Sequence, residues 1–335
     1  MDPCWYVTAA WGIHDERWTA ALREQDFEPH IISLEREGIT IDQARTMLIE
    51  AATQGDTSPV LAGPITTVTT PLVGIPQRLI GLSWGFDLLE QDDARQDNLN
   101  RLDHLIVDSP ASAAVAESCG LRPKSITRIY WGVDLDTFSP SGPTADLTGF
   151  GVPTGSPTVL SLRAHENLYR VEDLIEAWSE VHHHVPNAHL LVGNSGSFTK
   201  SLVDRARELG LDHTVHFIGR IPESELGPLL RAVLLYVSTS PIDGTSVTLL
   251  QAMACGCPVL VTDASGNRHW IDAQINGYLY PPADSNELTK QIVGALKDSG
   301  SAAQTRMIDA ALIRVRAEAD WHANQRLLRG ALSPT

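Results

Sequence analysis

The sequence predicts an α/β protein with two doubly wound parallel sheets. Short runs of β-branched and apolar residues alternate with longer amphipathic runs along the chain. Strands that alternate with helices of this length form βαβ units around a parallel sheet. The alternation stops over residues 139–157, where glycine, proline and small polar residues show no periodicity. Since the chain has 335 residues and a domain has about 150, this break predicts a linker between two domains.

The first domain is expected over residues 1–138. Its strands are predicted where short apolar runs end in small or polar residues, and its helices where apolar residues recur every three to four positions. The predicted strands are Cys4–Ala9, His30–Leu34, Val60–Ala62, Arg78–Ser83, His104–Val107 and Ile126–Tyr130. The predicted helices are Glu16–Gln25, Asp42–Ala52 and Ala111–Cys119.

The second domain is expected over residues 139–301, where the alternation restarts. A long closing helix, from about Ala302 to Leu328, has no strand after it. The predicted strands are Thr158–Leu162, His189–Val192, Val215–Phe217, Leu234–Val237, Pro258–Val261 and Tyr278–Tyr280. The predicted helices are Val171–His184, Lys200–Leu209, Ser224–Arg231, Val247–Ala254 and Glu287–Lys297.

The composition argues against nucleic acid or an anionic membrane as the main partner, but not against a small anionic ligand. There are 41 acidic and 25 basic residues, for a formal net charge of −16, whereas nucleic acids and anionic membranes need a basic face. No apolar run approaches the roughly 18 to 20 residues of a membrane span, and the start Met1-Asp2-Pro3 is not that of a signal peptide. Four sparse cysteines predict reduced thiols. We therefore expect a cytoplasmic protein without a transmembrane segment.

The segment over residues 238–263 carries the strongest functional signal. A predicted strand ends there, a loop with Asp243 and Gly244 follows, and a helix begins near Thr245 or Ser246, with Thr245 as the expected N-cap. The unpaired N–H groups of a first helical turn concentrate partial positive charge and can bind a phosphate without a basic side chain. The pattern indicates a diphosphate site, in which Asp243 and Gln251 can hydrogen-bond hydroxyls on either side. An ordinary strand–loop–helix with a capping hydroxyl is the alternative.

Four further motifs fall in the same order as in a known family. The motifs are YWGVDLDTFSP at 130–140, FIGRI at 217–221, AMACGCPV at 252–259 and NGYLYPPAD at 276–284. Together with Asp243 and Gln251, which stand where the family has two glutamates separated by seven residues, they resemble the retaining glycosyltransferases of family 4, also called glycosyl transferases group 1. The resemblance implies the GT-B fold, in which two Rossmann-like domains face a cleft. It also implies that the closing helix, residues 302–330, packs back on the first domain.

The resemblance implies a function in carbohydrate biosynthesis. A sugar would move from a nucleotide-sugar to a hydroxyl of a small-molecule or glycan acceptor, with retention and without a metal. The expected co-substrate is a nucleotide-sugar, with a UDP-sugar favoured, and no other cofactor is expected. Asp243 would hold the donor sugar, Gln251 the ribose, and Arg163 the phosphates. The residues expected around the rest of the nucleotide are Gly244, Thr245, Ser246, Val247, Arg220, Ile221 and Arg170.

The sequence departs from the family pattern at several of these positions. Tyr169 stands where a lysine is common, and the neighbouring Arg170 is the expected substitute. Gln251 replaces a carboxylate but can still hydrogen-bond a ribose, and His269 stands where a glutamate is usual. These departures keep two alternatives open, a non-catalytic relative that binds a nucleotide or glycan, and a GT-B phosphorylase or epimerase.

Candidates in the first domain follow its predicted strands. His14 follows the first strand and is expected to face the cleft, where it binds acceptor or diphosphate or else caps a helix. Trp84 and Asp87 follow another strand and are expected on the acceptor side. His182-His183-His184 is interpreted as a solvated helix end, because adjacent helical positions point about 100° apart and do not converge on one ion.

Overall fold

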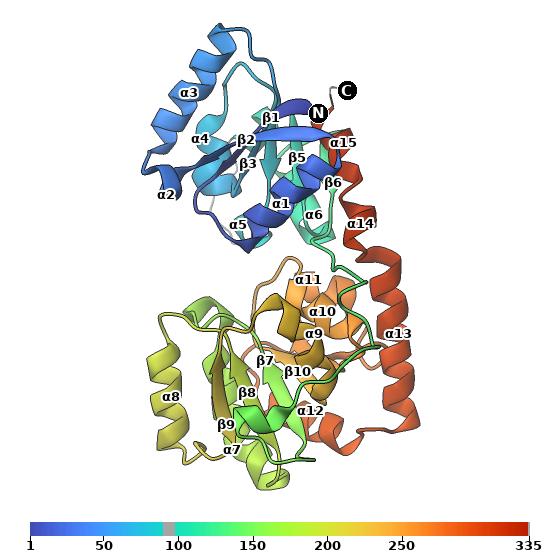
Figure 1. Ribbon diagram of the computed structural model, residues 1–335. Helices are drawn as coiled ribbons and strands as arrows, with labels where there is room; N and C mark the ends of the chain where they lie inside the picture. Colours follow the sequence, from blue (N-terminus) through green and yellow to red (C-terminus); the bar gives the residue numbers. More distant parts are fainter. Residues whose placement is uncertain (90–97, 334–335) are drawn as a thin grey trace. The chain divides into compact units, whose positions relative to one another are not determined.

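The computed structural model describes residues 1–89 and 98–333, which form two compact units (Figure 1). Unit 1 comprises Met1–Trp131 and His322–Thr335, and unit 2 comprises Gly132–Trp321. Each unit is built on a six-stranded sheet in which all strand pairs are parallel. The predicted fold class is therefore confirmed. The chain passes from unit 1 to unit 2 after Trp131, ahead of the predicted boundary at residue 138, and Phe138 is buried.

The sheet of unit 1 has the strand order β2-β1-β3-β4-β5-β6. Helices cover it, and strands β3, β4 and β5 are buried throughout, as is typical of a parallel sheet. Its strands are β1 (Asp2–Thr8), β2 (Phe27–Ser33), β3 (Val60–Gly63), β4 (Leu79–Leu82), β5 (His104–Val107) and β6 (Ile126–Arg128). Its helices are α1 (Ile13–Glu24), α2 (Leu34–Glu37), α3 (Ile41–Thr53), α4 (Thr70–Leu72), α5 (Phe86–Leu89), α6 (Pro110–Ser118) and α15 (Leu327–Leu332). A π-helical turn (Ile65–Thr69) precedes α4.

The sheet of unit 2 has the order β12-β11-β10-β7-β8-β9. Its strands are β7 (Thr158–Ser161), β8 (His189–Gly193), β9 (Val215–Gly219), β10 (Leu235–Ser238), β11 (Val259–Thr262) and β12 (Tyr278–Tyr280). Its helices are α7 (Val171–His184), α8 (Thr199–Glu208), α9 (Glu223–Ala232), α10 (Val247–Ala254), α11 (Ser265–Trp270), α12 (Ser285–Lys297) and α13 (Ala302–Glu318). In α7, the apolar residues Val171, Leu174, Ile175, Trp178 and Val181 recur at helical spacing and are all buried in the core.

The predicted continuous helix from 302 to 328 is wrong. The structure has three helices there, α13, α14 (Trp321–Asn324) and α15. Val133 explains the first break, because its N–H donates to the Ala319 carbonyl at 2.7 Å and its carbonyl accepts from the Trp321 N–H at 3.1 Å. Backbone groups that an uninterrupted helix would use internally are thus bonded to another segment. Helix α13 lies in unit 2, in contact with α10, whereas α15 lies in unit 1, in contact with β5.

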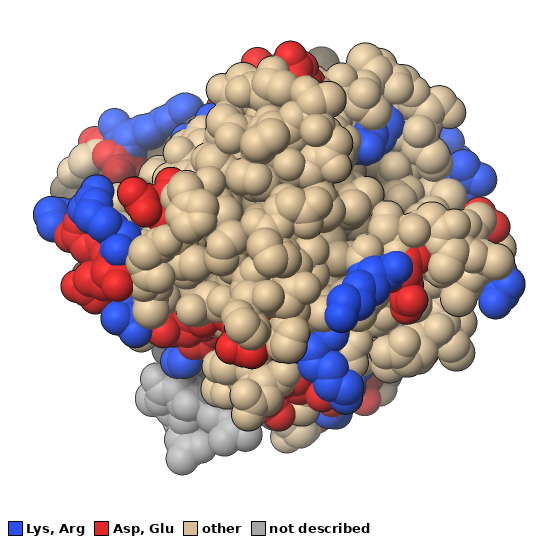
Figure 2. Space-filling model, turned by 90° about the horizontal axis from the view of Figure 1, so that it is seen from below, with Lys and Arg blue, Asp and Glu red and all other residues tan. Residues whose placement is uncertain are grey.

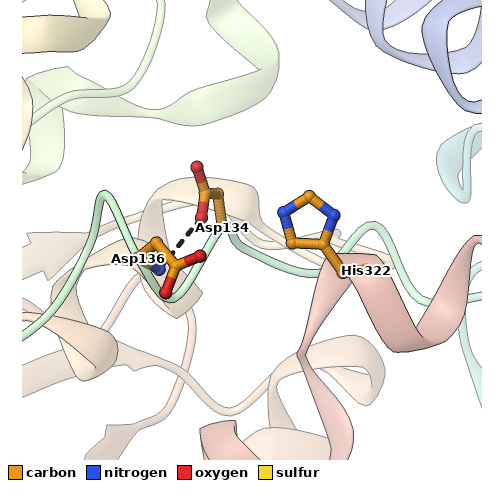
Figure 3. A group of neighbouring side chains, drawn as sticks. All are labelled: Asp134, Asp136 and His322. Atoms are coloured by element: carbon orange, nitrogen blue, oxygen red, sulfur yellow. Dashed lines mark hydrogen bonds between the residues drawn. The ribbon is translucent and has the colours of Figure 1, made fainter.

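The turn that follows Val133 is fixed by one carboxylate. Asp134 Oδ1 accepts from the backbone N–H of Asp136 at 2.9 Å (Figure 3). Asp134 Oδ2 accepts from the Thr137 hydroxyl at 2.7 Å. An aspartate that bonds the backbone two residues ahead forms an Asx turn. The VDLDT portion of the motif at 130–140 therefore forms a turn held by its own side chains.

Charged side chains of both signs lie on the surface, and the cysteines are unpaired. On the face shown in Figure 2, basic side chains stand beside acidic ones around an uncharged area. No described helix is both long and apolar enough to cross a membrane. The four cysteines are free thiols, and burial raises the pKa of Cys4 to about 12 and that of Cys255 to about 11.

His189 and His216 form a pair at the beginning of β8 and β9. His189 Nδ1 lies 2.9 Å from His216 Nε2, and the rings are stacked with centroids 5.2 Å apart. Burial lowers the pKa of both imidazoles, and neighbouring histidines lower that of His189 further. The folded protein therefore holds this pair uncharged at a pH at which the unfolded chain begins to bind protons.

We expect the stability of unit 2 to fall as the pH drops below the ordinary histidine pKa of about 6.5. The unfolded chain then binds more protons than the folded one, so the free energy of unfolding decreases with decreasing pH. His216→Gln, which keeps a hydrogen-bonding partner for His189, should reduce this dependence in urea titrations at pH 7.5 and 5.5. The exposed His184, replaced by glutamine, is the control, and an equal reduction by both variants would contradict the assignment.

Candidate functional site

Strand β10, a loop and helix α10 follow one another as the sequence predicts. Ser246, rather than Thr245, is the N-cap of α10, and its Oγ accepts from the Leu249 N–H at 3.4 Å. The Thr245 hydroxyl instead accepts from Trp270 Nε1 at 3.3 Å. The N–H groups at the start of α10 have no carbonyl of their own helix to bond, and they concentrate partial positive charge.

Arg163 lies beside this helix start, just after β7. Its Nη1 donates to Ser246 Oγ at 2.8 Å, and its Nη2 lies 3.1 Å from Asp243 Oδ2. Its Cζ lies 4.3 Å from the centroid of the Tyr169 ring, within the range of a cation–π interaction. The structure therefore brings Arg163, Asp243 and Ser246 together, all three of which the sequence placed at the donor site, and adds Tyr169.

The Arg163–Asp243 pair is largely withdrawn from water, with each side chain 12% exposed. Burial raises the pKa of Asp243, while the Arg163 charge and the Gly244 N–H oppose that rise. Burial alone would lower the pKa of Arg163, but the Asp243 carboxylate, together with Tyr236 and Tyr169, outweighs this effect and the pKa is raised. An anion that binds Arg163 will compete with Asp243 and free this carboxylate for other partners.

A chain of hydroxyl groups supports the pair from the sheet side. The Tyr236 hydroxyl on β10 lies 2.7 Å from Thr248 Oγ1, which lies 3.2 Å from Ser246 Oγ. Tyr236 is fully buried, and a buried tyrosine needs a partner for its hydroxyl. Tyr236 was missed by the sequence analysis, although a tyrosine within an apolar strand is a signal that could have identified it.

Gln251 lies on α10 and is only 6% exposed. Its Oε1 has no hydrogen-bond partner among the described residues. A buried amide oxygen without a partner is costly, so a ligand that donates a hydrogen bond here would remove that cost.

Helix α11 covers the loop ahead of α10. A Cβ atom on Gly266 would lie 2.0 Å from the Asp243 carbonyl oxygen and 2.1 Å from that of Gly244, so only glycine fits. Thr245 and Ser246 are consequently only 7% and 4% exposed. The helix start is less open than the sequence suggests, because α11 was not predicted.

Other candidates of unit 2 lie on other elements. Arg170 donates twice to the Asp173 carboxylate, both times at 2.7 Å, and this pairing raises its pKa. Its guanidinium is thus engaged at the first turn of α7. Arg220 and Ile221 lie just beyond the end of β9. His269 Nε2 lies 3.2 Å from a Glu318 carboxylate oxygen on α13.

In unit 1, His14 packs among tryptophans. Its ring centroid lies 4.5 Å from that of Trp131 and 5.5 Å from that of Trp84. Burial, with a contribution from Arg17, lowers the pKa of His14. Helix α1 is capped by other groups, since the Gly12 N–H donates to Asp15 Oδ2 at 2.8 Å. The lowered pKa favours the neutral imidazole, which can both donate and accept a hydrogen bond.

Asp87 holds two loops of unit 1 together. Its Oδ1 accepts from Ser83 Oγ at 2.7 Å and from the Trp84 N–H at 3.0 Å, and its Oδ2 accepts from the Ile65 N–H at 2.7 Å. The residue is 2% exposed. The carboxylate thus faces protein groups and fixes the backbone around Trp84, whose Nε1 has no hydrogen-bond partner among the described residues.

Comparison with known proteins shows which family has these features. The model of the family described as glycosyl transferases group 1 matches residues 146–313, about half of the chain. N-acetyl-alpha-D-glucosaminyl L-malate synthase of Bacillus anthracis is 25% identical over 175 residues, which cover 52% of this chain and 45% of that protein. D-inositol 3-phosphate glycosyltransferase of Mycobacterium tuberculosis is 29% identical over 177 residues, which cover 51% of this chain and 36% of that protein. The matches thus span less than half the length of these curated relatives.

Solved structures resemble the chain over almost its whole length. HepE of Anabaena, solved in complex with UDP and glucose, has a TM-score of 0.81 at 18% identity, with 99% of both chains covered. A glycosyltransferase of Rickettsia africae has a TM-score of 0.82 at 17% identity, with 100% of this chain and 99% of that chain covered. At these identities the likeness concerns the fold. The two parallel sheets, the match over residues 146–313 and the shared fold lead to one conclusion: the chain belongs to the glycosyl transferases group 1 family, with the GT-B fold.

Proposed function

We propose that the chain is a retaining glycosyltransferase that moves a sugar from a nucleotide-sugar to a hydroxyl acceptor without a metal ion. The observation that carries the proposal is the position of Arg163, which donates to the N-cap hydroxyl of α10 and pairs with Asp243. A fixed guanidinium and a helix N-terminus that meet at one point form a site for a diphosphate. Both groups are positive, although the chain as a whole is acidic.

The chemistry depends on the charge that develops on the leaving group. The bond between the anomeric carbon and the diphosphate oxygen breaks, and negative charge grows on that oxygen. Arg163 and the N–H groups at the start of α10 would stabilise this charge, which is usually the largest single contribution to catalysis. The acceptor hydroxyl attacks the same face of the sugar, and its proton passes to the departing phosphate oxygen. No side chain then needs to act as a dedicated base.

Two polar side chains can orient the donor within the same site. When a phosphate takes over Arg163, the Asp243 carboxylate becomes free to accept from hydroxyls of the donor sugar. The unpaired Oε1 of Gln251 can accept from a ribose hydroxyl. In unit 1, His14 and Trp84 remain candidates for the acceptor side. A UDP-sugar is the favoured donor, and the complexes of HepE with UDP-glucose and with UDP support that choice.

A donor panel tests the proposal. UDP-, GDP-, ADP- and TDP-sugars are added one at a time, and we expect one class to raise the melting temperature, because a ligand that binds only the folded state stabilises it. Transfer is then followed by NMR of the anomeric proton, and an α-linked donor should give an α-linked product. A product of inverted configuration would contradict retention. Release of free sugar phosphate would indicate a phosphorylase, and binding without turnover would indicate the non-catalytic alternative.

Tyr169 provides a further test of the site. Tyr169→Leu should lower kcat/KM for the donor by about 10-fold, because the face of the Arg163 guanidinium loses its aromatic partner. Tyr169→Phe keeps the ring and should remain within about 2-fold of wild type. Both variants keep the backbone carbonyl that accepts from Thr239 Oγ1 at 2.9 Å, so this hydrogen bond holds the loop in both of them. If leucine has the same effect in an Arg163→Ala background, the ring acts on the loop and not through Arg163.

A further inference from the structure

A pocket lined by arginines lies at the amino-terminal edge of the sheet of unit 1. Residues 74–79 together with Arg101 and Asp103 line an open pocket of about 420 Å³, a volume typical of sites for small molecules. Strands β4 and β5 begin at this pocket, whereas the loops that carry His14 and Trp84 follow the carboxyl ends of strands. The pocket and the acceptor-side candidates therefore lie at opposite edges of one sheet.

Arg78 and Arg101 line this pocket, Arg45 lies beside its lining residue Gly74, and uncharged acceptors hold all three guanidinium groups. Arg45 Nη1 donates to the carbonyls of Pro71 at 2.8 Å and Val73 at 3.0 Å. Arg78 Nη1 donates to the Ala331 carbonyl at 2.7 Å. Arg101 Nη1 lies 3.3 Å from Asn98 Oδ1. These contacts orient the arginines but do not neutralise their charge.

Among the described residues, none of the three arginines forms an ion pair. Within residues 1–89 and 98–333, no carboxylate lies within ion-pair distance of Arg45, Arg78 or Arg101. Asp103 is the acidic residue in the lining, and its Oδ2 accepts from the Leu79 N–H at 2.9 Å. Burial lowers the pKa of Arg78 by more than Asp103 raises it. An excess of positive charge in a chain of net charge −16 indicates a site for an anion.

A glycine leaves space between two of the guanidinium groups. A Cβ atom on Gly74 would lie 3.6 Å from Arg45 Nη2 and 3.8 Å from Arg101 Nη2, and no third atom lies within 4 Å. Gly74 has a φ of +91°, which residues with a side chain rarely adopt. The guanidinium groups of Arg45 and Arg101 therefore both lie close to Gly74, which lines the pocket.

We propose that this pocket binds the phosphate group of a small molecule, with Arg45, Arg78 and Arg101 as the binding residues. Arginine is suited to this purpose because its planar fork can bond two phosphate oxygens at once. The site lies in unit 1, whereas Arg163 and α10 lie in unit 2. The proposal therefore does not depend on the proposed donor site or on transfer activity.

Titration of the whole chain with inorganic phosphate tests the site. By isothermal titration calorimetry, Arg101→Gln should raise the dissociation constant at least about 10-fold, since a charged hydrogen bond is lost. The matched control is Arg128→Gln, which removes an exposed arginine at the carboxyl end of β6, at the opposite edge of the sheet, and should leave the constant unchanged. Hydrogen exchange should show protection over residues 71–79 in wild type with phosphate, and not in Arg101→Gln. Arg163 is intact in all three proteins, so binding there does not alter the comparison.

Further outcomes decide the proposal and the source of the phosphate. Equal affinities of wild type and Arg101→Gln, or no binding at millimolar phosphate, would overturn it. Because Arg101 is exposed, its replacement should leave the melting temperature unchanged. Arg78→Gln is a second variant of the site, and its melting temperature is measured beside its dissociation constant for phosphate. Sedimentation with vesicles of phosphatidylcholine, with and without phosphatidylglycerol, separates a lipid headgroup from a free phosphate ester. Arg101-dependent binding to the anionic vesicles would support the site and assign it to a headgroup.

Discussion

Replacement of Arg163 by alanine is expected to lower kcat/KM for the nucleotide-sugar by on the order of 100-fold. This is the effect of losing about 3 kcal/mol of transition-state stabilisation, as is typical when one group that stabilises a developing oxyanion is removed. Arg163 Nη1 and Nη2 already have fixed partners in Ser246 and Asp243, so little reorganisation is needed when the charge develops. Steady-state kinetics with the donor identified in the panel give the measurement.

Two further variants make this result interpretable. Arg163→Lys keeps the charge but not the planar fork, and should fall between wild type and alanine. Arg207→Ala removes an exposed arginine of unit 2 whose Nη1 lies 3.1 Å from Asp204 Oδ1. This variant should leave the kinetics unchanged. Unchanged rates in Arg163→Ala, with a verified donor, would refute the role assigned to this residue.

Replacement of Gly266 by alanine is expected to damage the same site without touching a polar side chain. The added methyl carbon would lie 2.0 Å from the Asp243 carbonyl oxygen, so α11 or the loop must move. We expect a loss of about 1 to 3 kcal/mol of stability and at least about 10-fold weaker donor binding, because Asp243 and the start of α10 are displaced together. Urea unfolding and donor titration measure the two effects.

A second glycine provides the control. Gly294 lies within α12, and a Cβ atom on it would meet no atom within 4 Å. Gly294→Ala should therefore raise stability by up to about 1 kcal/mol, as is typical for alanine in a helix, with donor binding unchanged. Normal donor binding by Gly266→Ala would show that the loop tolerates the shift and that its position is not critical.

The fold could be predicted because its signals are local. Helices α7 and α10 begin and end at the predicted residues, since each has a buried face at helical spacing. The twelve predicted strands all occur, because buried parallel strands are short continuous apolar runs between turn residues. The closing helix could not be predicted, because its first break is made by Val133, which is distant in sequence. Helix α11 is short and carries little periodic pattern.

The site could be predicted only in part, because some of its residues are neighbours in the sequence and others meet only through packing. Asp243, Ser246 and Gln251 lie in one continuous segment, so their proximity follows from the local strand–loop–helix. Arg163 was placed by family resemblance, and the structure explains its proximity, because β7 and β10 are neighbours in the sheet. Tyr169, by contrast, was noted only because it stands where a lysine is common in the family. Its contact with the Arg163 guanidinium depends on how two segments pack. For Arg170, the sequence could not show that Asp173 is its partner.

Helix α15 belongs to unit 1, although the helix α13 ahead of it belongs to unit 2. The buried residues Leu328 and Leu332 and the Ala331 carbonyl, which accepts from Arg78, tie this short helix to the amino-terminal half of the chain. A fragment that contains only residues 1–131 would therefore lack part of its own core, and should fold poorly unless 322–335 is supplied. For the same reason, recombination between relatives could exchange unit 1 intact only if two separate stretches of the gene moved together.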